Sequence, residues 1–148
     1  MSYKNILVTY NYHFLVHKEL TLSKTILIVD DSSPLRRLLA DFIKTKFNFK
    51  TYEAENGQEA LDAIDGLDGK IDLIFLDIDM PIMDGITFIK KFKSDKFTKS
   101  IPIICLTAKN DKATVAACIK YGVNEYIAKP YDLFDVAKKV NKALGIKA

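Results

Sequence analysis

Four short apolar runs, each closed by a polar side chain, constrain the fold of this chain more than any other feature of its 148 residues. The runs are KTILIVDD, IDLIFLD, IPIICLT and NEYIAKP. They end at Asp30 and Asp31, at Asp77, at Thr107 and at Lys129. Nearly continuous apolar runs of this length are typical of parallel strands that are buried on both faces of a sheet.

Segments with the periodicity of amphipathic helices separate these runs. In the first of them, apolar residues from Leu35 to Ile43 recur at helical spacing. Ser32 or Ser33 can cap this helix, and Pro34 suits its first turn. We expect strands at residues 25–30, 50–54, 70–77, 101–107 and 124–128. We expect helices at residues 32–47, 56–65, 86–95, 111–121 and 132–144.

This alternation predicts an α/β fold in which a parallel sheet is covered by helices on both faces. No Gly/Ser-rich linker interrupts the pattern, and the length suits one domain, so we expect a single domain at residues 24–148. Residues 1–23 lie outside the pattern. Three alternatives are open for this N-terminal extension: a poorly ordered tail, an added strand or helix that mediates dimerisation, and a start codon placed too early.

The composition argues against several classes of protein. The net charge is only +3 and the lysines are scattered, so direct nucleic-acid binding is not expected. There is no run of about 18 apolar residues, and the N-terminus lacks the pattern of a signal peptide, so no membrane insertion is expected. Cys105 and Cys118 belong to no CxxC or Cys/His cluster, which favours a reducing cytoplasm.

The polar residues at the strand ends indicate phosphoryl chemistry assisted by a metal ion. The carboxyl ends of parallel strands meet at one edge of an open sheet, so these side chains should converge. Carboxylates that close would repel one another unless a cation neutralised them, and Mg2+ prefers oxygen ligands. We therefore expect Asp30, Asp31 and Asp77 to hold Mg2+, and Asp77 to be the nucleophile that accepts a phosphoryl group.

Residues at the ends of two further strands would surround that phosphoryl group. Thr107 and Lys129 would bind its oxygens, and the small side chain of Ala108 leaves room for it. Lys129 precedes Pro130, and the residue before a proline is held extended. A cis bond at Pro130 would make the turn sharp and aim the ammonium group inward.

The motifs ILIVDDS, DLIFLDIDMPIMDG, IPIICLTA and YIAKP resemble those of the response-regulator receiver domains of two-component signalling, in particular the stand-alone chemotaxis-regulator type. The resemblance covers about residues 24–146, and the spacings between Asp77, Thr107 and Lys129 agree with it. It implies a flavodoxin-like fold, with a doubly wound five-stranded parallel sheet of strand order 2-1-3-4-5.

The resemblance also implies a mechanism. A histidine kinase or phosphotransfer protein would phosphorylate Asp77 with Mg2+ as the cofactor, and the backbone carbonyl of Asp79 would be a further metal ligand. Thr107 and Tyr126 would form a conformational switch, and Asp79 and Lys109 would tune dephosphorylation. The protein would then be a phosphoacceptor switch that assists its own phosphorylation and dephosphorylation, rather than an enzyme.

In the family, output passes through the face made by the fourth helix, the fifth strand and the fifth helix. The chain ends soon after the last helix, so we expect signalling by phosphorylation-dependent partner binding or by phosphorelay. The residues expected on this face suggest an acidic partner, because they are mostly basic; they are Lys112, Lys120, Tyr126, Lys138 and Lys139.

Two alternatives compete with this interpretation. The sequence FLDID also resembles the start of haloacid-dehalogenase-type phosphatases, but Pro81 stands where those proteins usually have Thr or Val. Asp30, Asp31 and the Lys129–Pro130 turn also fit that class badly. The second alternative is a receiver-like binding module that does not use phosphate. Such modules typically lose one of the residues that this chain retains.

Overall fold

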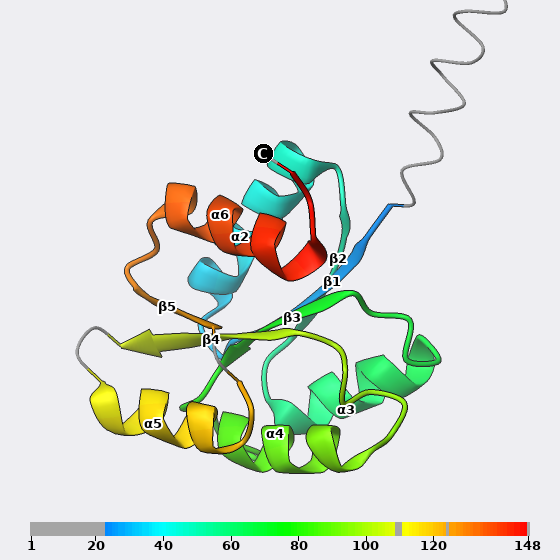
Figure 1. The fold of residues 1–148 in the computed structure, drawn as a ribbon, viewed down its shortest axis with the longest axis vertical. Helices are drawn as coiled ribbons and strands as arrows, with labels where there is room; N and C mark the ends of the chain where they lie inside the picture. The colour runs from blue at the N-terminus through cyan, green and yellow to red at the C-terminus, as the bar shows by residue number, and fades with distance from the viewer. Residues whose placement is uncertain (1–22, 109–110, 124, 148) are drawn as a thin grey trace, which may run out of the picture.

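A computed structural model of the chain describes residues 23–108, 111–123 and 125–147. Within these residues a five-stranded parallel sheet has the order β2-β1-β3-β4-β5 (Figure 1). The doubly wound α/β fold expected from the sequence is therefore confirmed, including its strand order. The strands are β1 (Thr25–Val29), β2 (Lys50–Ala54), β3 (Leu73–Asp77), β4 (Ile103–Ala108) and β5 (Glu125–Lys129).

Helices cover both faces of the sheet. They are α2 (Ser33–Phe47), α3 (Gly57–Gly66), α4 (Gly85–Ser94), α5 (Lys112–Lys120) and α6 (Leu133–Leu144). Figure 1 shows α2 and α6 on one side of the sheet and α3, α4 and α5 on the other. Helices on both faces explain why the central strands read as continuous apolar runs in the sequence.

Two separate apolar clusters result from this arrangement, one on each face of the sheet. In β3, Leu73 and Phe75 belong to the cluster on the side of α2 and α6, whereas Ile74 and Leu76 belong to the cluster on the opposite side. Successive side chains of a strand point to opposite faces, so one short strand contributes to both clusters. Every residue of β3 is buried, which fixes the strand that ends at Asp77.

The ends of the helices agree with the expected bounds to within one or two residues. Pro34 lies in the first turn of α2 as predicted, but the predicted cap is wrong in one respect. Ser32 occupies the capping position without a side-chain capping bond, and its backbone N–H donates a bond of 2.8 Å to Asp30 Oδ1. In contrast, Asp84 caps α4 by accepting a bond from the Thr87 N–H at 2.7 Å.

The three alternatives for residues 1–23 fall on the N-terminal segment, and residues 1–22 lie outside the described residues. Among the residues that the structure describes, none of the helices combines the length and the apolar character that a membrane crossing needs. Cys105 in β4 and Cys118 in α5 are both buried free thiols, and their Sγ atoms lie 2.9 Å apart.

Candidate functional site

The three aspartates singled out in the sequence come together at one edge of the sheet. Strands β1 and β3 are neighbours, with Val29 opposite Leu76, so Asp30 and Asp31 follow β1 beside the end of β3. One carboxylate oxygen from each of Asp30, Asp31 and Asp77 lies within 4.8 Å of the other two. Asp30 and Asp77 are buried and Asp31 is exposed, so the cluster is open to solvent on one side.

The Asp77 carboxyl is held in an environment that disfavours its charge. Burial raises its pKa from 3.8 to about 6, and the neighbouring charges of Asp30 and Asp31 act in the same direction, whereas Lys129 opposes them. A divalent cation would relieve this repulsion. Three close carboxylates are the donor set that a hard cation such as Mg2+ prefers, so these residues fit the ion that the sequence predicts.

Lys129 supplies the positive charge of the site. Its Nζ lies 3.0 Å from Asp30 Oδ2 and 3.4 Å from Asp77 Oδ2. Burial alone would lower the pKa of Lys129, but the hydrogen bond with Asp30 and the charge of Asp77 outweigh it and raise the pKa above its ordinary value. The bond between Lys129 and Pro130 is cis, the isomer considered in the sequence analysis. Lys129 is therefore an inward-pointing, charged side chain rather than a solvated one.

Tyr131 belongs to the site, although the sequence analysis did not include it. Its hydroxyl donates a hydrogen bond of 3.1 Å to Asp30 Oδ2, the same oxygen that faces Lys129. Burial and the charge of Asp30 raise the pKa of Tyr131 well above its ordinary value, so the hydroxyl keeps its proton. The one available signal was its position two residues after Lys129, just beyond the turn at Pro130.

Arg36 is a second residue that sequence reasoning missed. It is almost fully buried and donates a bond of 2.6 Å to the backbone carbonyl of Asp30. Its guanidinium also forms ion pairs with Glu53 and Glu55, which follow one another closely around the end of β2. Arg36 therefore joins α2, β1 and β2 behind the acidic cluster. Only its place on the buried face of the first helix could have revealed this role.

The close packing of the loop after β3 explains why the motif DMPIMDG ends in a glycine, Gly85. A Cβ atom at Gly85 would lie 2.6 Å from the Asp77 carbonyl oxygen. Any residue other than glycine would therefore clash with the backbone at this position. The Gly85 N–H also bonds the Ile78 carbonyl at 2.8 Å, which turns the chain back against the end of β3. Ile82 has a φ of 67° and is 85% exposed. A β-branched residue with positive φ is strained, so this loop holds one unfavourable backbone conformation beside the site.

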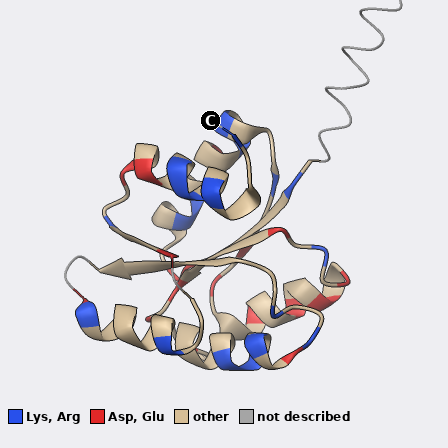
Figure 2. Ribbon diagram, in the orientation of Figure 1, with Lys and Arg blue, Asp and Glu red and all other residues tan. Residues whose placement is uncertain are grey.

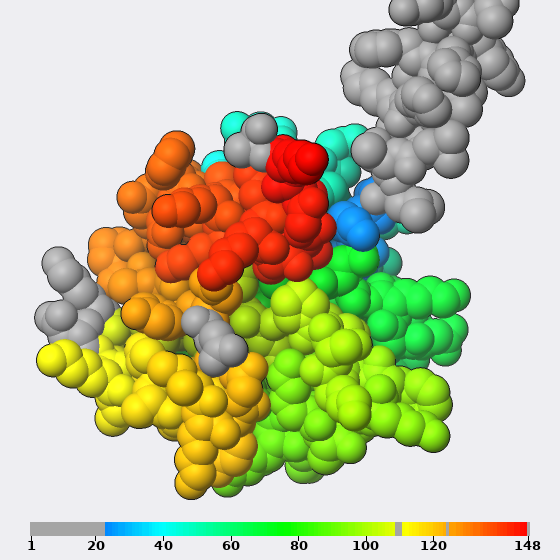
Figure 3. Space-filling model, viewed as in Figure 1, coloured from blue at the N-terminus to red at the C-terminus, as the bar shows by residue number. Residues whose placement is uncertain are grey.

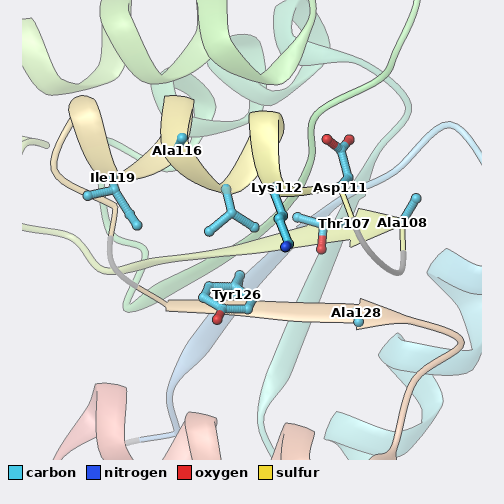
Figure 4. Close-up of a pocket in the computed structure, with 9 residues that line it drawn as sticks. Thr107, Ala108, Asp111, Lys112, Ala116, Ile119, Tyr126 and Ala128 are labelled. Atoms are coloured by element: carbon cyan, nitrogen blue, oxygen red, sulfur yellow. The ribbon is translucent and has the colours of Figure 1, made fainter.

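Thr107 and Ala108 lie at the end of β4, on the strand next to β3. Asp77 is opposite Leu106, so Thr107 stands one residue closer to the outer edge of the sheet. Thr107 is buried and Ala108 is exposed. Thr107 also borders a cavity of about 300 Å³ between β4, β5 and α5. Figure 4 shows Thr107, Lys112 and Tyr126 around this cavity.

Tyr126 lies on β5, opposite Cys105 and two residues before the partner of Thr107. Tyr126 is 45% exposed. Lys139 of α6 donates a bond of 2.5 Å to the Tyr126 carbonyl, and its Nζ lies 5.4 Å from the centre of the ring. Tyr126 and Thr107 thus line one cavity, while Lys139 contacts Tyr126 from the α6 side.

Of the two residues expected to tune dephosphorylation, only Asp79 is among the described residues. Asp79 lies in the loop directly after β3 and its side chain is exposed. Its backbone carbonyl follows two residues after Asp77, and its role as a metal ligand stays a prediction. Lys109 lies outside the described residues, so the structure does not bear on a pairing between Asp79 and Lys109.

Residues 26–141 match the family described as the response regulator receiver domain. The chain belongs to this family. The match sets aside the haloacid-dehalogenase-type phosphatase considered from the sequence. The two remaining alternatives are a receiver domain that uses phosphate and a receiver domain that does not.

Individual relatives agree with this assignment. The receiver domain is 38% identical over 121 residues to the chemotaxis protein CheY1 of Helicobacter pylori, a match that covers 81% of this chain and 96% of that protein. A crystal structure of a putative response regulator from Chloroflexus aurantiacus superimposes with a TM-score of 0.77 at 30% identity, covering 83% of this chain and 98% of that one.

A further solved structure shows a receiver domain with a partner. It is the co-crystal structure of the Saccharomyces cerevisiae phosphotransfer protein Ypd1 with the receiver domain of the response regulator Ssk1. The similarity has a TM-score of 0.74 at 26% identity, and it covers 84% of this chain and 90% of that chain.

Proposed function

We propose that this receiver domain is a response regulator in which Asp77 accepts a phosphoryl group from a phosphohistidine, in a step that depends on Mg2+. The observation that carries the proposal is the setting of the Asp77 carboxylate. It is 7% exposed, it lies within 4.8 Å of two other carboxylates, and Lys129 Nζ lies 3.4 Å from its Oδ2. Such a buried carboxylate is costly for folding, and its retention is explained by chemistry at this position.

In the proposed transfer, a carboxylate oxygen of Asp77 attacks phosphorus while the bond from phosphorus to the donor imidazole breaks. The product is an aspartyl phosphate, a mixed anhydride. With a pKa of about 6, Asp77 is largely ionised near pH 7 and holds the electron pair that the attack needs. Asp30, Asp31 and Asp77, with the Asp79 carbonyl, would hold Mg2+. The bound ion would neutralise charge between the carboxylates and the phosphoryl oxygens.

Residues of β4 and β5 would receive the phosphoryl oxygens. Lys129 already lies near Asp77 and can turn its ammonium group to an oxygen of the phosphoryl group. The Thr107 hydroxyl would donate to another oxygen, and Ala108 would leave space beside it. Movement of Thr107 toward the phosphoryl group would change the cavity that it shares with Tyr126, so that Tyr126 turns inward.

The phosphorylated form is proposed to be transient. Attack of water on phosphorus would restore the Asp77 carboxylate and release inorganic phosphate. The receiver domain would thus assist both its phosphorylation and its dephosphorylation, with Asp79 and Lys109 setting the lifetime of the phosphorylated state. We expect Asp79→Met to change that lifetime several-fold in a radiolabel decay assay, with an unchanged decay rate as the contrary result.

A histidine kinase or a phosphotransfer protein is the proposed donor. The complex of Ypd1 with the Ssk1 receiver domain supports this choice by analogy. The downstream target would bind α5, β5 and α6, which Figure 3 shows on one face of the molecule. Lysines occur along α5 and α6, so an acidic partner in the cytoplasm is proposed (Figure 2). The residues of this surface are Lys112, Lys120, Tyr126, Lys138 and Lys139.

The deciding experiment is labelling with radioactive acetyl phosphate, with and without Mg2+, of the wild type, Asp77→Asn and Asp62→Asn. Asp62 is an exposed carboxylate on α3 and serves as the matched control. We expect base-labile label that requires Mg2+, persists in Asp62→Asn and is lost in Asp77→Asn. Label that persists in Asp77→Asn would refute the assignment. A folded wild type that binds Mg2+ but takes no label would support the phosphate-independent binding module.

A further inference from the structure

We propose that Tyr131 is a positioning residue that fixes the Asp30 carboxylate for Mg2+ binding and holds it in place when Lys129 turns to the phosphoryl group. This inference rests on the proposed function for its second part only. The first part concerns the metal-free and metal-bound protein and needs no phosphoryl transfer. Tyr131 reaches Asp30 from the segment between β5 and α6, so the contact joins the far edge of the sheet to the end of β1.

The Asp30 carboxylate is fully buried and depends on donors from the protein. Its Oδ1 accepts a bond of 2.8 Å from the Ser32 backbone N–H. Its Oδ2 faces the Lys129 ammonium at 3.0 Å and the Tyr131 hydroxyl at 3.1 Å. A buried carboxylate that loses a hydrogen-bond donor is destabilised, because no water replaces the lost bond. Each of these contacts therefore helps to fix the orientation of the carboxylate.

The two donors to Asp30 Oδ2, Lys129 and Tyr131, differ in their other contacts. Lys129 is shared, because its Nζ also lies 3.4 Å from Asp77 Oδ2. The Tyr131 hydroxyl is hydrogen bonded to Asp30, and its ring packs against the apolar cluster on the side of α2 and α6. A ring held by packing keeps its hydroxyl in place. When Lys129 moves to a phosphoryl oxygen, Tyr131 is therefore the donor that stays on Asp30 Oδ2.

Removal of the hydroxyl should therefore weaken metal binding and also slow the transfer step, during which Lys129 leaves Asp30. In Tyr131→Phe the Asp30 carboxylate has only Lys129 on Oδ2, and this bond must break or weaken when Lys129 is needed at Asp77. Loss of a group that orients a metal ligand commonly weakens metal affinity by about 10-fold or more. We expect the Mg2+ dissociation constant to rise about 10-fold. At saturating Mg2+ the labelling rate should still lie below that of the wild type, because Asp30 Oδ2 has no donor left once Lys129 turns to the phosphoryl group.

The test is calorimetric titration of the metal-free full-length protein with Mg2+, using the wild type, Tyr131→Phe and Tyr52→Phe. Tyr52 lies on β2 outside the acidic cluster and controls for the loss of a phenol hydroxyl. Labelling rates with acetyl phosphate across a range of Mg2+ concentrations then separate affinity from maximal rate. A purely structural role for Tyr131 would instead lower stability and leave the Mg2+ dissociation constant within about twofold of the wild type, which would overturn the inference.

A second measurement uses the wild type alone and stays informative if the variant folds poorly. Addition of Mg2+ should shift the NMR resonances of the Tyr131 ring and leave those of Tyr52 in place. Unshifted Tyr131 resonances at saturating Mg2+ would also refute the inference. A wild type that binds Mg2+ but takes no label would contradict the proposed function alone, whereas a wild type that does not bind Mg2+ would overturn both.

Discussion

Strands β3 and β5 both carry residues of the site, yet they are built in opposite ways. All five residues of β3 are buried, and it lies between β1 and β4 in the middle of the sheet. Strand β5 lies at the edge, and of its residues only Ile127 is buried. The carboxylate that we propose as the phosphoacceptor thus stands on the most enclosed strand. The residues that we propose to respond to it, Tyr126 and Lys129, stand on a more accessible edge strand.

The comparison suggests that the two strands have different roles: β3 fixes the nucleophile, and β5 carries the side chains that move. A strand that is packed on both faces fixes the position of its last side chain, which suits a nucleophile that must meet phosphorus in line. A half-exposed side chain on an edge strand, such as Tyr126, has more room to change rotamer. The predictions that follow test this contrast, from the largest expected effect to the smallest.

Truncation of a buried side chain on β3 should destabilise the protein far more than truncation on β5. Phe75 is fully buried, so Phe75→Ala should lower the free energy of unfolding by about 3–5 kcal/mol. Tyr126→Ala removes a ring that is 45% exposed and should cost less than about 1 kcal/mol. Urea unfolding of both variants measures this difference. Similar losses in the two variants would contradict the contrast between the strands.

The Asp77 carboxylate should make the stability of the metal-free protein depend on pH. Its pKa rises from 3.8 to about 6 on folding, so the folded state binds the proton more tightly than the unfolded chain. The carboxylate therefore costs stability above pH 6, and the cost disappears as the pH falls from about 6 to about 4. Asp77→Asn should be more stable than the wild type at about pH 7.5, by at most about 3 kcal/mol.

Urea unfolding of the wild type and Asp77→Asn without Mg2+, at several pH values, provides the check. The difference between the two free energies of unfolding should shrink as the pH falls. A difference that stays constant between about pH 4 and about pH 7.5 would show that burial does not perturb this carboxyl. Addition of Mg2+ should stabilise the wild type more than Asp77→Asn, because the ion favours the ionised carboxylate.

Lys139 should hold Tyr126 in its half-exposed position on β5. Lys139→Met removes the bond to the Tyr126 carbonyl, the cation over its ring and the ion pair with Asp135. We expect a loss of about 1 kcal/mol in stability and a shift of the Tyr126 ring resonances in NMR spectra. Lys138→Met, one residue earlier on the exposed side of α6, is the matched control and should cost less than about 0.5 kcal/mol. Equal effects of the two variants would argue against a specific contact.

Relief of the strained backbone after β3 should give the smallest effect, and one of opposite sign. Ile82 has a φ of 67° and is 85% exposed, so Ile82→Asn gives up little packing. Asn tolerates the left-handed conformation better, and we expect a gain of about 0.5–1 kcal/mol. Ile119→Asn, at an exposed position in the α5 helix, should not stabilise. A fall in the melting temperature for Ile82→Asn would show that its side chain contributes more than the strain costs.

The fold could be predicted from the sequence because its signals are local. Apolar runs marked four of the five strands, and helical periodicity with Pro34 near its start marked α2. The convergence of Asp30, Asp31, Asp77 and Lys129 also followed from a general property of parallel sheets, since their strands end at one edge.

Contacts that depend on packing between distant segments could not be predicted. Tyr131 lies 101 positions after Asp30, and nothing in the local sequence shows that the turn at Pro130 directs its hydroxyl to that carboxylate. The same applies to the thiols of Cys105 and Cys118, which meet only because α5 packs on β4. The absence of a side-chain capping bond at Ser32 was also not visible in the local sequence, where a serine before Pro34 favours such a cap.

The two apolar clusters, one on each face of the sheet, have no residue in common. Substitutions in one cluster should therefore combine almost additively with substitutions in the other when the two sites lie on different elements and share no partner. Substitutions can then accumulate in one helical layer without requiring compensating substitutions in the other. The surface of α5, β5 and α6 crosses the boundary between the two layers, so a changed partner preference can arise by redesigning one helix while its neighbour keeps its packing.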